Sequence, residues 1–206
     1  MQEFNLAVFS SHFGSNLQSI IDAKKNGKIL SSVKVVISNN QDSYALVRAK
    51  QESINNLYIS KTNYPDDNTR TQIILNVLNE NKIDLILLLG YMKKIPNLII
   101  KKYQNKIINI HPSLLPQYGG SGMYGIHVHK SIILNQEKYS GVSLHLVNEE
   151  YDQGHIISQL KIPVNKNDDE TSLQTRIQLI EHLLLVSTIQ LLEQRIINLG
   201  LFDDME

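Results

Sequence analysis

Short apolar runs alternate with helical periodicity over the first half of the chain. The apolar and often β-branched runs predict strands, at positions 6–9, 33–37, 57–59, 85–89 and 107–110. Apolar residues at helical spacing predict helices between them, at positions 16–25, 43–51, 66–79 and 96–103. Strands that alternate with helices indicate an α/β fold with a parallel sheet and right-handed crossovers. Such folds bind ligands in the loops beyond the carboxyl ends of their strands.

The pattern changes at His111. Residues 111–125 are rich in glycine and proline and show little periodicity, which predicts a functional loop rather than a linker. Two further strands are expected, at positions 144–147 and 156–162. A last helix is predicted from about Thr171 to Ile197, opened by a capping box that pairs Thr171 with Gln174.

The composition is that of an ordinary globular chain. Its 206 residues include 20 Lys+Arg, 20 Asp+Glu and no cysteine, and a chain of this length fits one domain. A net charge of zero provides no basic surface for nucleic acid or an anionic membrane, so we expect neither partner. Without cysteine the chain cannot form disulfides, thiol nucleophiles, iron–sulfur clusters or cysteine-based zinc sites.

The first residues, MQEFNLAVFSS, contain no basic segment, and their apolar run is too short for a signal sequence or a membrane span. We therefore expect a cytoplasmic protein with no targeting segment. The absence of cysteine is compatible with a reducing compartment of this kind.

The first segment with candidate chemistry lies where the first strand gives way to a helix. Gly14, Ser15 and Asn16 stand at this turn. The N–H groups in the first turn of a helix have no partner within the helix, and the helix dipole favours negative charge there. The segment therefore predicts an anion site, and the alternative is that Ser15 or Asn16 only caps the helix.

A second candidate centre combines a strand end with an acidic loop. Asn109 and His111 are two positions apart in a predicted strand, so their side chains should point to the same face. An amide donor beside an imidazole suits a reaction in which a carbonyl oxygen gains negative charge while the attacking group loses a proton. Asp152, in the acidic segment 149–154, could orient His111 or a water. The alternatives are a capping asparagine, a packed histidine and a solvated hairpin loop.

The histidines suggest a rival interpretation, a metal site. On a strand, His127 and His129 would share one face, and with His111, His145 or His155 they could bind zinc or iron. The sequence around His127 favours the start of a helix instead, which would place the two imidazoles about 200° apart.

The octet NIHPSLLP at positions 109–116 resembles the signature of the folate-dependent formyltransferases. Together with GSNLQ at 14–18, LGYM at 89–92 and DQG at 152–154, it resembles the branch that formylates glycinamide ribonucleotide. The likeness runs in unbroken order over nearly the whole chain, and formyltransferases of other branches usually carry an additional domain. The resemblance implies a formyltransferase fold, that is, a Rossmann-like, mostly parallel twisted sheet with helices on both faces.

The resemblance implies that a formyl group passes from 10-formyltetrahydrofolate to the primary amine of glycinamide ribonucleotide in purine biosynthesis, without a metal. It places the catalytic roles on Asn109, His111 and Asp152. Asn109 and a protonated His111 would donate hydrogen bonds to the formyl oxygen as it becomes an oxyanion. Asp152 would hold the imidazole, help to carry the proton of the amine towards the folate nitrogen, and raise the pKa of His111 so that it stays charged at neutral pH.

The resemblance also assigns binding residues. The ribonucleotide would contact Gly14, Ser15, Asn16 and Glu181, although Glu181 could instead be an exposed helix charge. The folate would contact Arg70, Met92, Lys93, Lys94, Ile95, Asn109, Asn148, Glu149, Glu150, Tyr151 and Asp152. We expect one domain over residues 1–206, with a nucleotide-binding half at 1–110 and a catalytic and folate-binding half at 111–206, in a monomer or homodimer.

The chain departs from the family pattern just after the octet. The glycine-rich segment Gly119–Gly125 is several residues longer than the usual turn, and we expect it to form a lid or a subunit contact. Two other functions stay open at this point. The first is formyl transfer to another amine, such as an amino-sugar nucleotide, and the second is a His-metal hydrolase or a non-catalytic mononucleotide-binding module.

Overall fold

The computed structural model describes residues 1–199, and over that range the chain is built around one seven-stranded sheet. The strands are β1 (Asn5–Phe9), β2 (Ser32–Ser38), β3 (Asn55–Tyr58), β4 (Leu85–Leu88), β5 (Ile107–His111), β6 (Tyr139–Leu146) and β7 (Ile156–Pro163). The helices are α1 (Ser15–Lys25), α2 (Tyr44–Gln51), α3 (Asp67–Glu80), α4 (Asn97–Lys102), α5 (Ile126–Leu134) and α6 (Glu170–Glu193).

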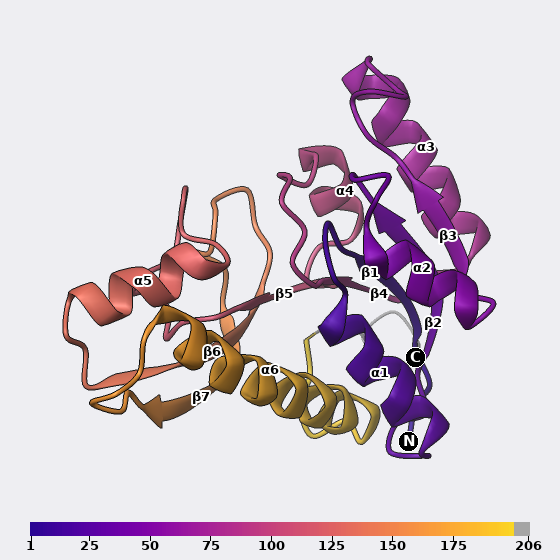
Figure 1. Cartoon of the computed structure of the whole chain (residues 1–206). Helices are drawn as coiled ribbons and strands as arrows, with labels where there is room; N and C mark the ends of the chain where they lie inside the picture. Colours follow the sequence, from indigo (N-terminus) through magenta and orange to yellow (C-terminus); the bar gives the residue numbers. More distant parts are fainter. Residues whose placement is uncertain (200–206) are drawn as a thin grey trace.

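The strands lie in the order β3-β2-β1-β4-β5-β6-β7 (Figure 1). Neighbours from β3 to β5 are parallel, whereas β5 pairs with β6 and β6 with β7 in the antiparallel sense. This mostly parallel sheet confirms the expected α/β fold class. Its two antiparallel strands extend the sheet beyond β5, and α6 runs alongside them towards α1 (Figure 1).

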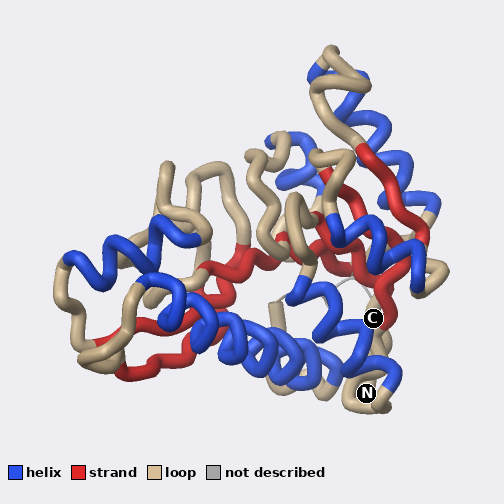
Figure 2. Tube along the Cα trace, viewed as in Figure 1, coloured by secondary structure: helices blue, strands red, loops and turns tan. Residues whose placement is uncertain are grey.

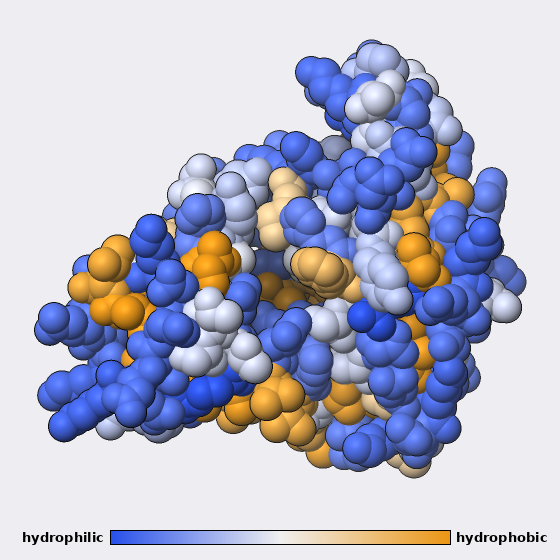
Figure 3. Space-filling view, in the orientation of Figure 1, coloured by the Kyte–Doolittle hydropathy of each residue, from blue (hydrophilic) through white to orange (hydrophobic). Residues whose placement is uncertain are grey.

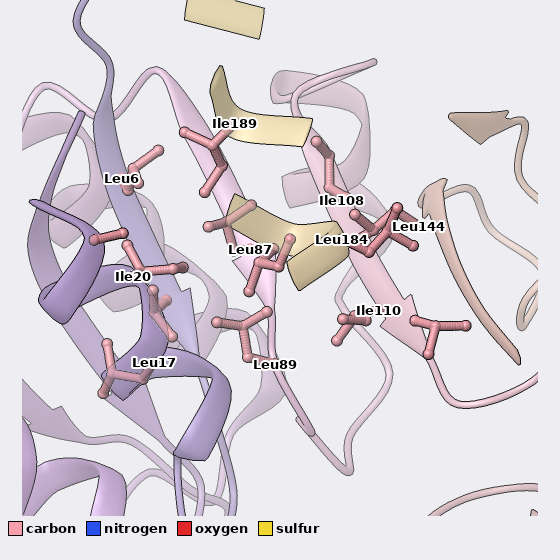
Figure 4. Close-up of a cluster of buried hydrophobic side chains, with 14 of the residues drawn as sticks. Leu6, Leu17, Ile20, Leu87, Leu89, Ile108, Ile110, Leu144, Leu184 and Ile189 are labelled. Atoms are coloured by element: carbon pink, nitrogen blue, oxygen red, sulfur yellow. The ribbon is translucent and has the colours of Figure 1, made fainter. Parts of the chain in front are cut away.

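Helices cover both faces of the sheet, as the trace in Figure 2 shows. In a strand, successive side chains point to opposite faces. In β1, Leu6 and Val8 therefore join a core cluster with α1, α2, α5 and α6. Ala7 and Phe9 join a second cluster with α3 and α4. Figure 4 shows part of the first cluster, in which Leu6 and Leu87 from the sheet lie among side chains of α1 and α6.

Four helix boundaries follow from local chemistry. The expected helix at 66–79 is confirmed as α3, with Asp66 as its N-cap accepting from the N–H of Thr69. The helix expected to include Pro96 in its first turn begins one residue later, because Pro96 has an extended ψ and is the N-cap. For α6 the expected pairing of Thr171 with Gln174 is wrong. Asp169 caps this helix in a capping box with Ser172, and the helix ends at Glu193 instead of residue 197.

The sixth strand is longer than expected. The sequence predicted a strand at 144–147, whereas β6 begins at Tyr139. The added stretch contains two serines and Gly141, residues that disfavour strands in isolation. Tertiary packing requires Gly141 there, since a β-carbon would lie 2.1 Å from the carbonyl oxygen of Leu160 and 2.5 Å from Leu114 Cδ2. The strand therefore contains a glycine despite the low strand propensity of that residue, because the neighbouring backbone approaches too closely for any side chain.

No helix within residues 1–199 combines the length and the apolar character that crossing a membrane requires.

Truncation of Leu87 tests the contribution of the central strand. Leu87 is 1% exposed between two helical layers, so Leu87→Ala should lower the free energy of unfolding by about 2–5 kcal/mol. The matched control is Leu134→Ala at a side chain that is 69% exposed, which should change stability by less than about 0.5 kcal/mol. Urea titration followed by circular dichroism measures both. Equal losses in the two variants would contradict the packing described for β4.

Candidate active site

One large cavity opens at the carboxyl ends of the central strands. It has a volume of about 860 Å³ and is lined by the loops that follow β1, β4 and β5, by the loop between β6 and β7, and by α6. In the space-filling view a hollow is visible in the middle of the molecular face (Figure 3). The cavity lies at the point where the strand order reverses. From β1 the chain first adds β2 and β3 on one side, and then adds β4 and β5 on the other side. This is the usual ligand position in open α/β sheets.

The first wall of the cavity is the turn from β1 into α1. Gly14 is the N-cap of α1, has a φ of 67° and caps without a side chain. A β-carbon on Gly14 would lie 2.8 Å from Ala45 Cβ, so the turn depends on glycine both for its conformation and for this close approach. The expected alternative, that Ser15 or Asn16 caps the helix, is wrong, because neither makes a side-chain cap bond.

Both polar side chains of this turn contact α6 instead. Gln178 Nε2 donates to Ser15 Oγ over 2.7 Å, and Asn16 Nδ2 donates to Glu181 Oε2 over 3.0 Å. Asn16 Oδ1 is buried and has no hydrogen-bond partner among residues 1–199. Burial raises the pKa of Glu181 to about 7, although the hydrogen bond from Asn16 acts in the opposite direction. Glu181 is therefore a cavity residue rather than an exposed helix charge.

Asn109, His111 and Asp152 meet in the opposite wall. Asn109 and His111 are two positions apart in β5, so their side chains lie on the same face of the strand, and both approach the carboxylate of Asp152. Asn109 Nδ2 donates to Asp152 Oδ1 over 3.3 Å, and His111 Nδ1 lies 3.6 Å from Asp152 Oδ2. The side chain of Asp152 is only 12% exposed. Residues from β5 and from the β6–β7 loop, 41 to 43 positions apart in the chain, thus form one cluster.

A second histidine completes this cluster. His145 lies opposite Asn109 in the antiparallel β5–β6 pairing. Its Nε2 is 3.0 Å from Asn109 Nδ2 and 3.5 Å from Asp152 Oδ1, while its Nδ1 donates to the carbonyl oxygen of Leu146. Because Nδ1 holds the proton of the neutral ring, Nε2 can accept a hydrogen bond from the Asn109 amide.

Main-chain groups after the NIHPSLLP segment hold the two acid–base side chains. The carbonyl oxygen of Tyr118 lies 2.7 Å from His111 Nε2, and the N–H of Gly120 donates to Asp152 Oδ2 over 2.8 Å. The predicted functional loop therefore contacts the cluster of His111 and Asp152 directly. Gly122 and Gly125, later in the same loop, line the cavity.

Burial changes the charge state expected for His111. Desolvation lowers its pKa below the ordinary value of 6.5, and the opposing effects of Asp152 and of the Tyr118 carbonyl do not outweigh it. The expectation that Asp152 keeps His111 charged at neutral pH is therefore wrong. Burial by itself would raise the pKa of Asp152, but the nearby His145 and His111 rings and the hydrogen bond from the Gly120 N–H lower it. At neutral pH the pair is a neutral imidazole beside a carboxylate.

The third wall carries the segment expected to bind a pterin. Met92, Lys93, Lys94 and Ile95 all line the cavity, and so do residues 148–152. The main-chain N–H of Met92 donates to Ser11 Oγ over 2.8 Å, which ties this segment to the loop after β1. The ammonium of Lys94 lies 5.7 Å from the ring centre of Tyr151 across the cavity mouth.

Arg70 is the one expected binding residue that does not line the cavity. Its guanidinium donates to the carbonyl oxygen of Tyr64, 2.7 Å away, and pairs with Asp67 one turn earlier on α3.

His127 and His129, the pair considered for a metal site, do not share one face. Residues 126–134 form α5, so His127 is exposed while His129 is buried. Burial lowers the pKa of His129 to about 4, and its Nδ1 has no hydrogen-bond partner within the described chain. Among residues 1–199 no three His, Asp or Glu side chains are grouped to hold a metal ion.

Sequence reasoning missed His145, the Tyr118 carbonyl and the Gly120 N–H as parts of this site. His145 carried one weak signal, a polar residue between the apolar Leu144 and Leu146 of a strand. The strand register that sets it opposite Asn109 has no such signal. Main-chain groups have none at all, because every residue carries them.

A family model and individual known proteins both match this chain. The model of the formyl transferase family matches residues 4–189 of the chain. A chloroplastic phosphoribosylglycinamide formyltransferase from Vigna unguiculata is 37% identical over 193 residues, which are 93% of this chain and 62% of that protein. The chain likewise spans 66% of the Arabidopsis thaliana protein of the same name, so it is shorter than both plant relatives.

Relatives of similar length also match. Phosphoribosylglycinamide formyltransferase from Dictyostelium discoideum is 37% identical over 205 residues, covering 93% of this chain and 99% of that one. Among solved structures, glycinamide ribonucleotide transformylase 1 from Symbiobacterium toebii superposes with a TM-score of 0.86 at 31% identity. That match covers 94% of this chain and 89% of the other.

The raised pKa of Glu181 predicts a pH-dependent stability. Between the ordinary carboxyl pKa of 4.5 and about 7, the folded protein keeps a proton that the unfolded chain has lost. The contribution of Glu181 to stability is thus fully present below pH 4.5 and is lost as pH rises to about 7. Relative to Glu181→Gln, the wild type should lose on the order of 3 kcal/mol over this range, at about 1.4 kcal/mol per pKa unit.

Urea unfolding of wild type and Glu181→Gln at intervals from pH 4.5 to 8 measures this difference. Glu80→Gln, which removes an exposed carboxyl at the end of α3, is the control and should follow the wild type. A constant difference between wild type and Glu181→Gln would contradict a buried, protonated Glu181.

Proposed function

This chain belongs to the formyl transferase family, and we propose that it transfers the formyl group of 10-formyltetrahydrofolate to the amine of glycinamide ribonucleotide, a step of purine biosynthesis. The observation that carries the proposal is the convergence of Asn109, His111 and Asp152 in one cavity that also contains the N-terminus of α1. The names of the relatives support the same acceptor. We place the enzyme in the cytoplasm, in line with its cysteine-free sequence.

The ribonucleotide is proposed to bind against α1 and α6. Its phosphate would accept hydrogen bonds from first-turn N–H groups at Gly14, Ser15 and Asn16, where the helix dipole also favours an anion. The sugar hydroxyls would contact Glu181 and the unpartnered Asn16 Oδ1, which is a buried acceptor. A Glu181 whose pKa is raised to about 7 suits this position, because at neutral pH it carries less negative charge near the phosphate than an ordinary carboxyl would.

The folate is proposed to bind between the segment after β4 and the β6–β7 loop. The pterin would lie along Met92, Lys93, Lys94 and Ile95, opposite residues 148–152, which line the other side of the same space. Arg70 does not line the cavity, so it is proposed to contact the carboxylate tail outside it. In this proposal the half formed by residues 1–110 holds the phosphate and also supplies Asn109, while residues 111–206 supply His111 and Asp152.

The proposed reaction is a direct attack of the amine on the formyl carbon. The new carbon–nitrogen bond forms first and leaves negative charge on the formyl oxygen, and the bond from the formyl carbon to N10 of the folate breaks as the carbonyl double bond is restored. The neutral His111 takes the amine proton on Nδ1 and returns it to N10 as the folate leaves. Asp152, 3.6 Å away, stabilises the imidazolium while it exists. No protein nucleophile is needed because the substrate amine attacks by itself.

Asn109 is proposed to stabilise the oxyanion that forms on the formyl oxygen. Both N–H groups of its amide already have an acceptor, Asp152 Oδ1 and His145 Nε2, so one of these hydrogen bonds would pass to the formyl oxygen when the substrates bind. The imidazolium of His111 is the second group that stabilises this negative charge once it has taken the proton.

The acceptor amine is tested directly with purified protein and 10-formyltetrahydrofolate. Glycinamide ribonucleotide and an amino-sugar nucleotide are supplied separately, and the release of tetrahydrofolate is followed by absorbance. We expect turnover with glycinamide ribonucleotide only. Turnover with the amino-sugar nucleotide alone would replace the proposed acceptor, and hydrolysis without either amine would replace the transfer reaction.

Loss of each catalytic side chain should lower kcat. Asn109→Ala, His111→Ala and Asp152→Asn should each reduce kcat by about 100–1000-fold, as for the removal of one oxyanion or proton-transfer group. His155→Ala, at an exposed histidine before β7, is the control and should keep wild-type kinetics. Near wild-type turnover in Asn109→Ala and His111→Ala together would remove the proposed mechanism.

A pair of glycine variants tests the phosphate position. Gly14 and Gly27 both have positive φ values, 67° and 66°, but only at Gly14 would a β-carbon meet backbone. Gly14→Ala should raise KM for the ribonucleotide about tenfold or more, which corresponds to about 1.4 kcal/mol of binding free energy. Gly27→Ala, with nothing within 4 Å of the new methyl group, should leave KM unchanged. Equal KM values in the two variants would place the phosphate elsewhere.

A further inference from the structure

One short piece of main chain supports both proposed proton-transfer side chains. The carbonyl oxygen of Tyr118 lies 2.7 Å from His111 Nε2, and the N–H of Gly120, two residues later, donates to Asp152 Oδ2 over 2.8 Å. A shift of this stretch would therefore move the contacts of His111 and Asp152 together. The orientation of the proton-transfer pair depends on what holds Tyr118 in place.

The side chain of Tyr118 is anchored at the C-terminal end of α5. Its hydroxyl donates to Glu137 Oε1 over 2.8 Å and accepts from Asn135 Nδ2 over 3.0 Å. Its ring packs against the main core cluster. Tyr118 has a φ of 57°, a left-handed conformation that is unfavourable for a bulky side chain. Side-chain contacts thus hold the main chain of Tyr118 in a conformation that it would not adopt by itself.

We infer that Tyr118 is a positioning residue of the reaction, whose hydroxyl anchor holds the carbonyl that keeps the proton of neutral His111 on Nε2. A carbonyl oxygen can only accept, so Nε2 must donate and the lone pair of the neutral ring is on Nδ1. That lone pair faces Asp152 Oδ2 at 3.6 Å. The inference rests on the proposed formyl transfer, in which Nδ1 is the atom that takes and returns the proton.

The groups that face His111 come from four parts of the chain. Asp152, in the β6–β7 loop, favours the charged imidazolium, and so does the hydrogen bond to the Tyr118 carbonyl. His145 on β6 disfavours it, and His129 on α5 is electrostatically coupled to His111 as well. A Tyr118 carbonyl that moves away removes one of the two favourable contacts. The pKa of His111 then falls further below its ordinary value.

Tyr118→Phe removes only the hydroxyl and keeps the packed ring. We expect kcat to fall about five- to tenfold, the equivalent of one lost hydrogen bond, while KM for both substrates stays within about twofold. The acid limb of the kcat profile should move to lower pH, because the pKa of His111 falls. Tyr58→Phe is the matched control. It removes another hydroxyl with a hydrogen bond, on β3 at the far edge of the sheet, and should change neither kcat nor its pH profile.

Glu137 variants test whether the anchor acts through this hydrogen bond. Glu137→Gln keeps an oxygen that accepts from Tyr118 and should retain wild-type kinetics and pH profile. Glu137→Ala should reproduce the direction of the Tyr118→Phe change, and the double variant should lose no more than Tyr118→Phe alone. Additive losses in the double variant would mean that the two side chains act independently, which would overturn the inference.

The state of the imidazole is read without turnover, by nitrogen-15 NMR of histidine-labelled protein. His111→Gln identifies the resonances by their loss. The neutral wild type should show a protonated Nε2 and an unprotonated Nδ1, and Tyr118→Phe should show a mixture of tautomers. If wild-type protein fails to transfer formyl groups, the proposed function is lost, while this spectrum still decides the tautomer. An unchanged spectrum and pH profile in Tyr118→Phe, even with a lower melting temperature, would reduce Tyr118 to a structural role and overturn the inference.

Discussion

A buried carboxylate needs hydrogen-bond donors around it, because an unpaired charge in a low-dielectric interior is very costly. Asp152 is in this position, and its donors come from separate parts of the chain. Asn109 on β5 and the N–H of Gly120 both donate to it, and His145 on β6 lies within 3.5 Å. Each of these contacts is available only if β5, β6 and the loop after β5 keep their places. The need to satisfy one side chain therefore constrains the whole catalytic end of the sheet.

The parallel and antiparallel parts of the sheet supply different groups to the cavity. Its parallel part brings the loops after β1 and β4 to one edge, together with the N-terminus of α1, so an anion can be bound without a basic surface. The antiparallel extension brings His145 opposite Asn109. Burial then acts in the same direction on two different groups, since it disfavours charge on both His111 and Glu181. Burial thus reduces the charge that these two side chains carry in the cavity.

Much of the fold could be predicted from local patterns. The apolar run of β4 and the alternation of strands and helices indicated a parallel sheet covered on both faces, as found. The errors occurred where packing outweighs propensity. The first part of β6, with Gly141 and two serines, looked unlike a strand, yet neighbouring backbone requires a glycine there. At α6 the competition between Asp169 and Thr171 for the cap was decided by geometry that composition does not encode.

For the site, the sequence by itself determined the chemical groups and their local order: Asn109 and His111 on one strand face, a glycine turn before a helix, and an acidic loop that contains Asp152. Those features follow from backbone periodicity and from turn chemistry, which act over a few residues. The tertiary structure alone decided that His145 faces Asn109, that Glu181 lies half-buried beside Asn16, that Arg70 does not line the cavity, and that desolvation lowers the pKa of His111. The reason is that register, burial and desolvation depend on contacts between residues far apart in the chain, and no local pattern records them.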